Sequence, residues 1–322
     1  MFDKLVLANL TPDSFPDAIW SRIQASAREV VSVERGPDDA ALKAALADAD
    51  GLIVKVGETA NAQLQDSATN LRYIGMHATG FGGIDISHAM MRGIVVTNVP
   101  DYSTESVAEL AIILAEIMAR NVFQERDRAR SGDVTDTEFV GRDLSTLTFG
   151  VVGAGYIGQR VVQRLQSYDS EVLYWSRNKK SNLDNSNLAR HVELDELLQA
   201  ADIVSLHLAA SAENLINAGR IAKLRDGAIL VNTAPNEILD LGAVFDRCQQ
   251  GSLRYAMDHA DELKADQPGL FERMQNTPNV EYLPPIGYAT AEASARKPEI
   301  LVENIEAFLA GSPIHHVNPA GD

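Results

Sequence analysis

The feature that most constrains this chain is a glycine pattern directly after a short apolar run. The run TFGVV leads into Gly153, Gly155 and Gly158, which form Gly-x-Gly-x-x-Gly at the start of an amphipathic segment, GVVGAGYIGQRVVQRL. The first glycine permits a tight turn, the second lets the backbone approach a pyrophosphate, and the third lets helix and strand pack closely. The amides near Tyr156 and Ile157 then face the ligand from the positive end of the helix dipole. The pattern predicts a dinucleotide site.

The loop after the next apolar run bears on which nucleotide is bound. In such sites an acidic residue roughly 20 residues beyond the glycines holds the ribose 2′-hydroxyl. Here the run EVLYW is followed by Ser176, Arg177, Asn178, Lys179 and Lys180, with no carboxylate. A hydroxyl and three cations suit a 2′-phosphate, which accepts charge-assisted hydrogen bonds from arginine and lysine. We therefore predict NADP, with NAD as the less favoured cofactor and an ordinary solvated basic loop as the alternative.

Charge and cysteine content narrow the classes of partner. The chain has 28 Lys and Arg against 45 Asp and Glu, a formal charge of −17, which disfavours nucleic acid and anionic membrane surfaces. The single cysteine, Cys248, fits a reducing compartment, and the start of the chain has no signal-peptide pattern. His315 and His316 lack partners at ligand spacing, so we expect no metal site. We expect a cytoplasmic protein without membrane contact.

Apolar runs rich in β-branched residues alternate with longer amphipathic segments along the 322 residues. This alternation predicts an α/β protein with two doubly wound parallel sheets. Segment 103–120 predicts a helix that is apolar nearly all round and therefore buried, with Ser106 and Glu109 as a capping box. In the last helix, from about 290 to 310, Pro298 should cause a kink or a restart. The runs begin at Lys4, Gly51, Arg72, Ile94, Thr148, Glu171, Asp202, Ala228, Leu253 and Val280.

Four stretches together resemble the D-isomer-specific 2-hydroxyacid dehydrogenase family. They are GFGGIDISHAMMRGIVVTNVPDYSTESVAEL, VVGAGYIGQRVVQRL, AILVNTAPNEILD and LPPIGYATAEA. The resemblance implies a Rossmann domain that binds the cofactor at 100–289, inserted into a split, flavodoxin-like substrate domain made of 1–99 and 290–322. It also implies a homodimer formed through the nucleotide-binding domain, by the long helix after Tyr102. Further cofactor contacts are assigned to His207, Thr233, Asp258 and Gly287.

The sequence departs from the family's pattern where the family carries its reactive groups. An arginine clamps the keto acid, a histidine donates the proton and a glutamate orients the histidine. Pro235 stands at the arginine's place in Asn-x-Ala-Arg-Gly, and Pro285 at the histidine's place in Pro-His-Ile-Gly. The glutamate's place is Leu263, with Glu262 one residue early and no family histidine to orient. Proline cannot transfer a proton.

Two functions remain open at this point. The first is an NADP-dependent reductase whose rebuilt site reduces a C=O, C=N or C=C bond in a substrate other than a simple 2-keto acid. The second is a nucleotide-binding regulatory or interaction protein that has lost catalysis. The basic loop favours the enzyme, because a protein that keeps only its fold has little need for a 2′-phosphate site. The family's pocket points to His77, Tyr102 and Tyr288 as catalytic candidates, and less to His259; each also fits a purely structural role.

Overall fold

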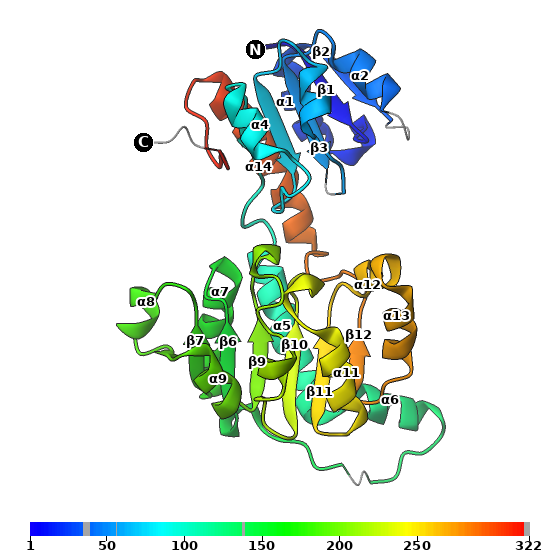
Figure 1. The fold of residues 1–322 in the computed structure, drawn as a ribbon, viewed down its shortest axis with the longest axis vertical. Coiled ribbons are helices and arrows are strands. Elements are labelled where there is room, and N and C mark those ends of the chain that lie inside the picture. Colours follow the sequence, from blue (N-terminus) through cyan, green and yellow to red (C-terminus); the bar gives the residue numbers. More distant parts are fainter. Residues whose placement is uncertain (35–38, 56, 137–138, 319–322) are drawn as a thin grey trace. The chain divides into compact units, whose positions relative to one another are not determined.

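The structure, a computed structural model, describes residues 1–34, 39–55, 57–136 and 139–318. The chain divides into two α/β units (Figure 1). Unit 1 comprises Met1–Tyr102 and Ala291–Asp322, and unit 2 comprises Ser103–Thr290. The chain enters unit 2 three residues later, and leaves it one residue later, than the resemblance implies.

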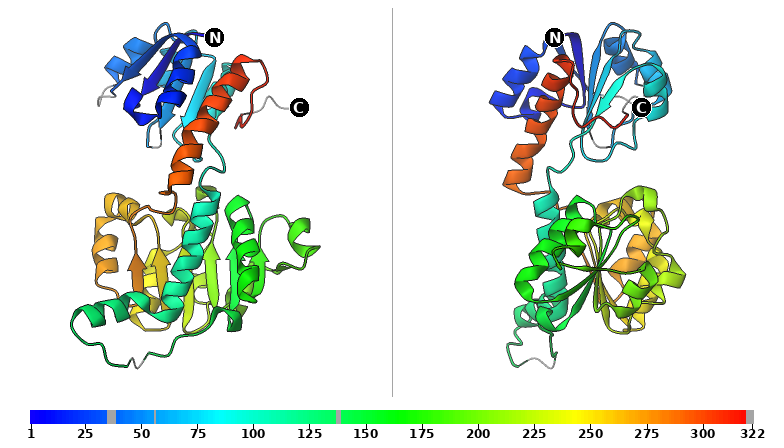
Figure 2. Two further views of the ribbon diagram at one scale, coloured as in Figure 1. Left: turned by 180° about the vertical axis from the view of Figure 1, so that it is seen from behind. Right: turned by 90° about the vertical axis from the view of Figure 1, so that its left-hand side faces the viewer.

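Unit 1 is built on a five-stranded parallel sheet in the order β2-β1-β3-β4-β5. This is the flavodoxin-like order. One face packs against α1 and α14, which Figure 2 shows lying along the sheet, and the other packs against α2, α3 and α4. The strands are β1 (Phe2–Ala8), β2 (Ala27–Val33), β3 (Gly51–Lys55), β4 (Tyr73–His77) and β5 (Val95–Thr97), and the helices are α1 (Asp17–Ala25), α2 (Ala40–Leu46), α3 (Ala62–Asp66), α4 (Ile86–Met91) and α14 (Ala291–Leu309).

Unit 2 is built on a seven-stranded parallel sheet in the order β12-β11-β10-β9-β6-β7-β8. Strand order reverses between β6 and β9, as in Rossmann domains. The two units confirm the predicted α/β class with two parallel sheets. The strands are β6 (Thr148–Val152), β7 (Glu171–Trp175), β8 (Arg190–His191), β9 (Ile203–Leu206), β10 (Ala228–Asn232), β11 (Leu253–Met257) and β12 (Val280–Tyr282).

Helices cover both faces of the unit 2 sheet. Buried side chains of α5, α7 and α8 pack on one face, and those of α9 to α13 pack on the other. Unit 2's sheet is thus enclosed, which explains why its strands read as continuous apolar runs. The helices are α5 (Thr104–Arg120), α6 (Val122–Arg130), α7 (Tyr156–Leu165), α8 (Ser181–Asp184), α9 (Leu194–Ala200), α10 (Ala218–Ile221), α11 (Leu241–Gln249), α12 (Ala260–Asp266) and α13 (Pro268–Gln275).

One expectation for the long helices is corrected, and one of the two alternatives for Pro298 is removed. The capping box is wrong, because α5 begins at Thr104 and Ser106 therefore lies inside the first turn. The Ser106 hydroxyl instead hydrogen-bonds the hydroxyl of Thr290 at 2.8 Å, while Glu109 pairs with Arg164 at 2.8 Å. The helix α14 does not restart at Pro298, since it continues from Ala291 to Leu309 with this proline buried inside it. No helix in the described part of the chain is long and apolar enough to cross a membrane.

Candidate functional site

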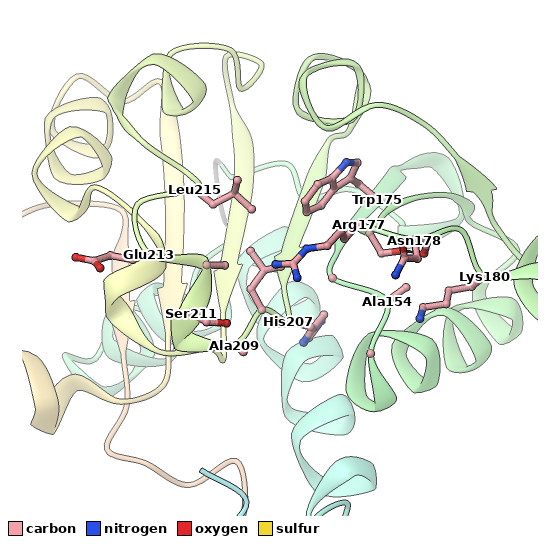
Figure 3. Close-up of a pocket in the computed structure, with 15 residues that line it drawn as sticks. Ala154, Trp175, Arg177, Asn178, Lys180, His207, Ala209, Ser211, Glu213 and Leu215 are labelled. Carbon is pink, nitrogen blue, oxygen red and sulfur yellow. Dashed lines mark hydrogen bonds between the residues drawn. The ribbon is translucent and has the colours of Figure 1, made fainter. Parts of the chain in front are cut away.

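A pocket of about 620 Å³ lies in unit 2, lined by the loops that follow β6, β7 and β9 (Figure 3). The strand order reverses between β6 and β9 at this place. In open α/β sheets ligands bind at the carboxyl ends of the strands, beside such a reversal. Residues 153–155, 175–178 with Lys180, and a loop from His207 to Leu215 contribute to the lining. Topology and loops therefore place one candidate ligand site here.

Three glycines shape the turn that enters α7. Gly153 has a φ of +97°, and a Cβ there would lie 2.4 Å from the carbonyl oxygen of His207. At Gly158 a Cβ would lie 1.9 Å from the carbonyl oxygen of Gly153, so the start of α7 packs directly on the turn. At Gly155, the N-cap of α7, a Cβ would meet no described atom within 4 Å. Packing thus requires the outer two glycines, whereas Gly155 faces open space at the start of α7.

The basic loop after β7 lines the same pocket. Arg177 extends into it, and Asn178 and Lys180 lie on the side of α7 (Figure 3). The loop is held by its own contacts: the Ser176 hydroxyl donates to the carbonyl oxygen of Asn178 at 2.6 Å, and the Lys180 amide donates to the Tyr174 hydroxyl at 2.9 Å. The loop backbone is therefore fixed while its cationic side chains remain available.

No carboxylate in the described part of the chain pairs with these cations. Neither Arg177, Lys179 nor Lys180 forms an ion pair with a carboxylate among the residues that the structure describes. By contrast, Arg164 pairs with two glutamates and Arg247 with Asp226. Unpaired cations beside an open pocket, in a chain of charge −17, favour an anionic ligand.

His207 supplies a neutral wall to the pocket. Its Nε2 lies 2.9 Å from the Ser205 hydroxyl, and its Nδ1 lies 3.5 Å from the hydroxyl of Thr233. Burial lowers the pKa of His207 to about 4, since desolvation disfavours the imidazolium. The ring is therefore uncharged at pH 7, and His207 takes part in the site by hydrogen bonding and not by charge.

Other residues assigned to the cofactor lie apart from this pocket's lining. Tyr156 is 71% exposed, and Ile157 packs under the α7 turn. Asp258 is buried, and its two carboxylate oxygens accept hydrogen bonds from the amides of Ile286 and Gly287, each at 3.0 Å. The structure therefore gives Asp258 and Gly287 a joint role in holding the loop after β12.

A histidine–glutamate pair lies at the end of β11. The Nδ1 of His259 lies 3.4 Å from a carboxylate oxygen of Glu262, and this contact is the main cause that raises the pKa of His259. The carbonyl oxygen of His259 accepts a hydrogen bond from the side chain of Asn236 at 3.1 Å. Glu262 thus has a histidine neighbour on its own helix end, although Pro285 stands at the place of the family's histidine.

The unit 1 candidates, His77 and Tyr102, lie near one lysine. His77 ends β4, its ring lies 5.5 Å from that of Phe15, and its buried Nε2 has no hydrogen-bond partner among the described residues. Burial, and next the charge of Lys297, lower the pKa of His77 to about 3. The Lys297 ammonium lies 5.3 Å from the centre of the Tyr102 ring. Tyr288 belongs to unit 2 and is 44% exposed, outside the pocket's lining.

Several residues that line the pocket were not predicted from the sequence. Trp175 ends β7, and Leu208, Ser211 and Glu213 belong to the loop after β9. They could have been predicted, because strands that neighbour the strand before the glycine turn also end beside the ligand site. In the described ranges, no group of three or more His, Cys, Asp or Glu side chains is placed to hold a metal ion.

Comparisons with known proteins point to one family. Residues 111–287 match the family model described as D-isomer specific 2-hydroxyacid dehydrogenase, NAD binding domain. The chain is 32% identical over 274 residues to a glyoxylate reductase of Pyrococcus furiosus, covering 82% of this chain and 80% of the relative. It is 31% identical over 264 residues to a hydroxypyruvate reductase of Blautia hydrogenotrophica, covering 79% and 80%. A crystal structure of D-lactate dehydrogenase from Aquifex aeolicus, complexed with NAD and lactic acid, aligns with a TM-score of 0.84 at 26% identity, covering 98% of this chain and 100% of that chain.

The glycine geometry predicts opposite effects for two substitutions. Gly155→Val should weaken NADPH binding by at least about tenfold, because its side chain fills the space left for phosphates, while the melting temperature stays nearly unchanged. Gly158→Ala should instead lower the free energy of unfolding by about 1 to 3 kcal/mol, because its Cβ overlaps a backbone oxygen. Calorimetric titration and thermal melts measure both. Full NADPH affinity in Gly155→Val would contradict the assignment of this turn to the nucleotide.

Proposed function

The chain belongs to the D-isomer specific 2-hydroxyacid dehydrogenase family, and from that premise we propose that it is an NADP(H)-dependent reductase with a rebuilt reactive site. Membership makes it an oxidoreductase with an NAD-binding domain. The finer proposal is that it reduces a C=O, C=N or C=C bond in a substrate other than a simple 2-keto acid. One observation carries the cofactor choice: the loop after β7 brings Arg177 to the pocket without any carboxylate.

The cofactor fits the residues that are present. Gly155 leaves room at the positive end of α7, where helix and amides favour phosphate. Arg177 and Lys180 supply the charge that a 2′-phosphate takes, and Ser176 supplies a hydroxyl beside them. His207 stays neutral and adds no charge at the same pocket. The bound cofactor supplies the hydride.

The substrate proposal depends on three positions of unit 2. Pro235 follows β10 and precedes the short helical turn Asn236–Ile238, so it offers no guanidinium for a carboxylate. Pro285 lies in the loop that Asp258 holds, and it offers no proton. Leu263 is buried in α12, leaving Glu262 to pair with His259. A site so composed lacks the groups that bind and protonate an ordinary 2-keto acid.

We place the substrate-side groups mainly on unit 1. His77 is neutral at pH 7 and donates or accepts a hydrogen bond there, since burial lowers its pKa to about 3. The Tyr102 hydroxyl is the group that holds a proton for delivery, because a phenol is protonated at neutral pH. Tyr288 is the third candidate. Of the histidines, only His259 has a pKa that its surroundings raise among the described groups, so it is the competing donor.

The assembly is part of the proposal. We place a homodimer contact on unit 2 around α5, where Ile113 is 46% exposed, and on neighbouring α6, where Val122 is 44% exposed. Large exposed aliphatic side chains on adjacent helices favour contact with a protein partner. A cytoplasmic location fits the single cysteine, Cys248, which is free and buried.

The first test concerns cofactor choice. NADPH should bind at least about tenfold more tightly than NADH, about 1.4 kcal/mol, which one charge-assisted phosphate contact can supply. Arg177→Ala should remove most of this difference, because Arg177 reaches into the pocket. Lys179→Ala is the matched control, since Lys179 lies in the same loop outside the lining. Calorimetry on both nucleotides measures the ratio, and an equal affinity or an NADH preference would overturn the NADP assignment.

The second test concerns the substrate class. Pyruvate, glyoxylate and hydroxypyruvate should all be poor substrates, with kcat/KM below roughly 10⁴ M⁻¹s⁻¹, because loss of a general acid alone typically costs 10²- to 10⁴-fold. The measurement is the loss of NADPH absorbance with these acids and with a panel of carbonyl, imine and enone compounds. Fast turnover of a simple 2-keto acid would refute the proposal. NADPH binding without turnover of any compound would favour a nucleotide-binding regulatory protein.

The third test locates the proton donor. Tyr102→Phe should reduce turnover of the best substrate by about 10²-fold, and His77→Ala should have an effect of similar size, because each loses a group that we propose acts on the substrate. The affinity for NADPH should change by less than about threefold in both variants, since neither residue lines the nucleotide pocket. His259→Gln is the comparison. If it abolishes turnover while the other two variants keep full rates, the donor is His259 and the unit 1 assignment fails.

A further inference from the structure

One lysine of unit 1, Lys297, lies over the ring of Tyr102 and has no ion pair among the residues that the structure describes. Lys297 lies in the first two turns of α14, the helix that packs against β4 and α1. It is half-buried, and no carboxylate forms an ion pair with it among the residues that the structure describes. Neighbouring Arg22, by contrast, is neutralised by Glu299 and Glu306. Half-burial penalises a bare ammonium, so an anionic ligand beside Lys297 would stabilise its charge.

The surroundings of Lys297 combine an aromatic ring with a buried histidine. Its ammonium lies 5.3 Å from the centre of the Tyr102 ring, within the range of a cation–π contact. The charge of Lys297 also reaches His77, where it adds to the effect of burial in lowering the pKa. His77 is only 8% exposed, and its Nε2 is buried with no hydrogen-bond partner in the described part of the chain. An uncompensated cation and an orphaned buried donor or acceptor therefore lie near each other.

Packing around the rings of His77 and Tyr102 holds these two residues in place. Phe15 packs on His77 with ring centres 5.5 Å apart, and Phe15 and Tyr102 belong to the same buried cluster. Arg296 donates a hydrogen bond from Nε to the carbonyl oxygen of Tyr102 at 3.0 Å, which ties the start of α14 to the end of the first chain segment. Lys297, His77 and Tyr102 are thus brought together from the two chain segments of unit 1 and held by packing.

We propose that Lys297 is the anion-binding residue of the substrate site, where its ammonium takes a carboxylate of the substrate while His77 Nε2 hydrogen-bonds an oxygen of the same molecule. This inference rests on the proposed function and narrows it: the substrate carries at least one carboxylate, and the charge that receives it lies on α14 and not after β10. In a chain of charge −17 such a local cation is required for any anionic substrate.

An ammonium at this place would select a different range of carboxylates than the arginine that the family uses. A guanidinium grips a carboxylate through two parallel hydrogen bonds, which favours one small, planar keto acid. An ammonium is a point charge on a flexible stem, and it accepts carboxylates in more than one orientation. The substrate class that follows is a carboxylate-bearing oxo, imino or enoyl compound, recognised by its charge and not by a fixed fork.

The test uses oxamate, an unreactive carboxylate, and oxamide, its neutral amide, on the NADPH-loaded full chain. Calorimetry should show that Lys297→Met weakens oxamate binding by at least about tenfold and oxamide binding by less than about twofold, since a charge-assisted contact is lost only with the anion. Lys297→Arg should retain oxamate binding within about threefold. Lys264→Met is the matched control, because its ammonium also lies over an aromatic ring, that of Phe271 at 5.8 Å, but in unit 2.

A second measurement on the unaltered chain covers the case in which Lys297→Met fails to fold. Acetic anhydride labelling, read by peptide mass spectrometry, should show Lys297 protected several-fold by oxamate but not by oxamide, with Lys264 unprotected as the internal reference. Equal protection by both compounds, or none by either, would overturn the inference. The two proposals can fail separately. If oxamate protects Lys297 but the protein turns over no compound, the anion subsite is upheld and the reductase proposal fails. If Lys297→Met leaves turnover unchanged and oxamate gives no protection, the reductase proposal stands and the anion subsite fails.

Discussion

The contact on which the nucleotide pocket depends is the one between the start of α7 and the turn before it. A Cβ at Gly158 would lie 1.9 Å from the carbonyl oxygen of Gly153, and one at Gly153 would lie 2.4 Å from that of His207. The backbone therefore comes close to itself at two points, and these contacts bring together the turn after β6, the first turn of α7 and the end of β9. Because backbone meets backbone, the helix terminus and the pocket wall hold a fixed position without any side chain. The open space at Gly155 follows from that packing.

Charge distribution separates the roles of the histidines. Burial keeps His77 and His207 neutral, with pKa values near 3 and 4, whereas Glu262 raises the pKa of His259. A neutral imidazole can orient a ligand by hydrogen bonding, but it carries no proton to give up at pH 7 as an imidazolium does. In our proposals, the positive charges that bind anionic groups are therefore those of Arg177 in the loop after β7 and Lys297 on α14.

Sequence reasoning succeeded where one local pattern determines one local structure. The glycines, the strand before them and the basic loop are contiguous, so their joint pocket could be predicted from spacing alone. Prediction from the sequence failed for strands that are short or exposed. It also failed for contacts between residues that are far apart in the sequence. The edge strand β2 has mostly exposed or half-buried residues and no long apolar run, and the two-residue β8 is too short to leave a pattern. Lys297 and Tyr102 are 195 positions apart, and only the packing of α14 brings them together.

The layout of unit 2 explains how a nucleotide site can persist while the reactive groups change. The pocket draws on loops after β6, β7 and β9, which occupy one half of the sheet. The three positions where we propose that the family's reactive groups are missing follow β10, β11 and β12, in the other half. A proline or a leucine in those loops leaves the glycine turn and the basic loop unchanged, because none of the three positions lines this pocket. This pocket and the three substituted positions therefore draw on different loops of the sheet. In our proposal, that division lets the reaction or the substrate change while the glycine turn and the basic loop stay as they are.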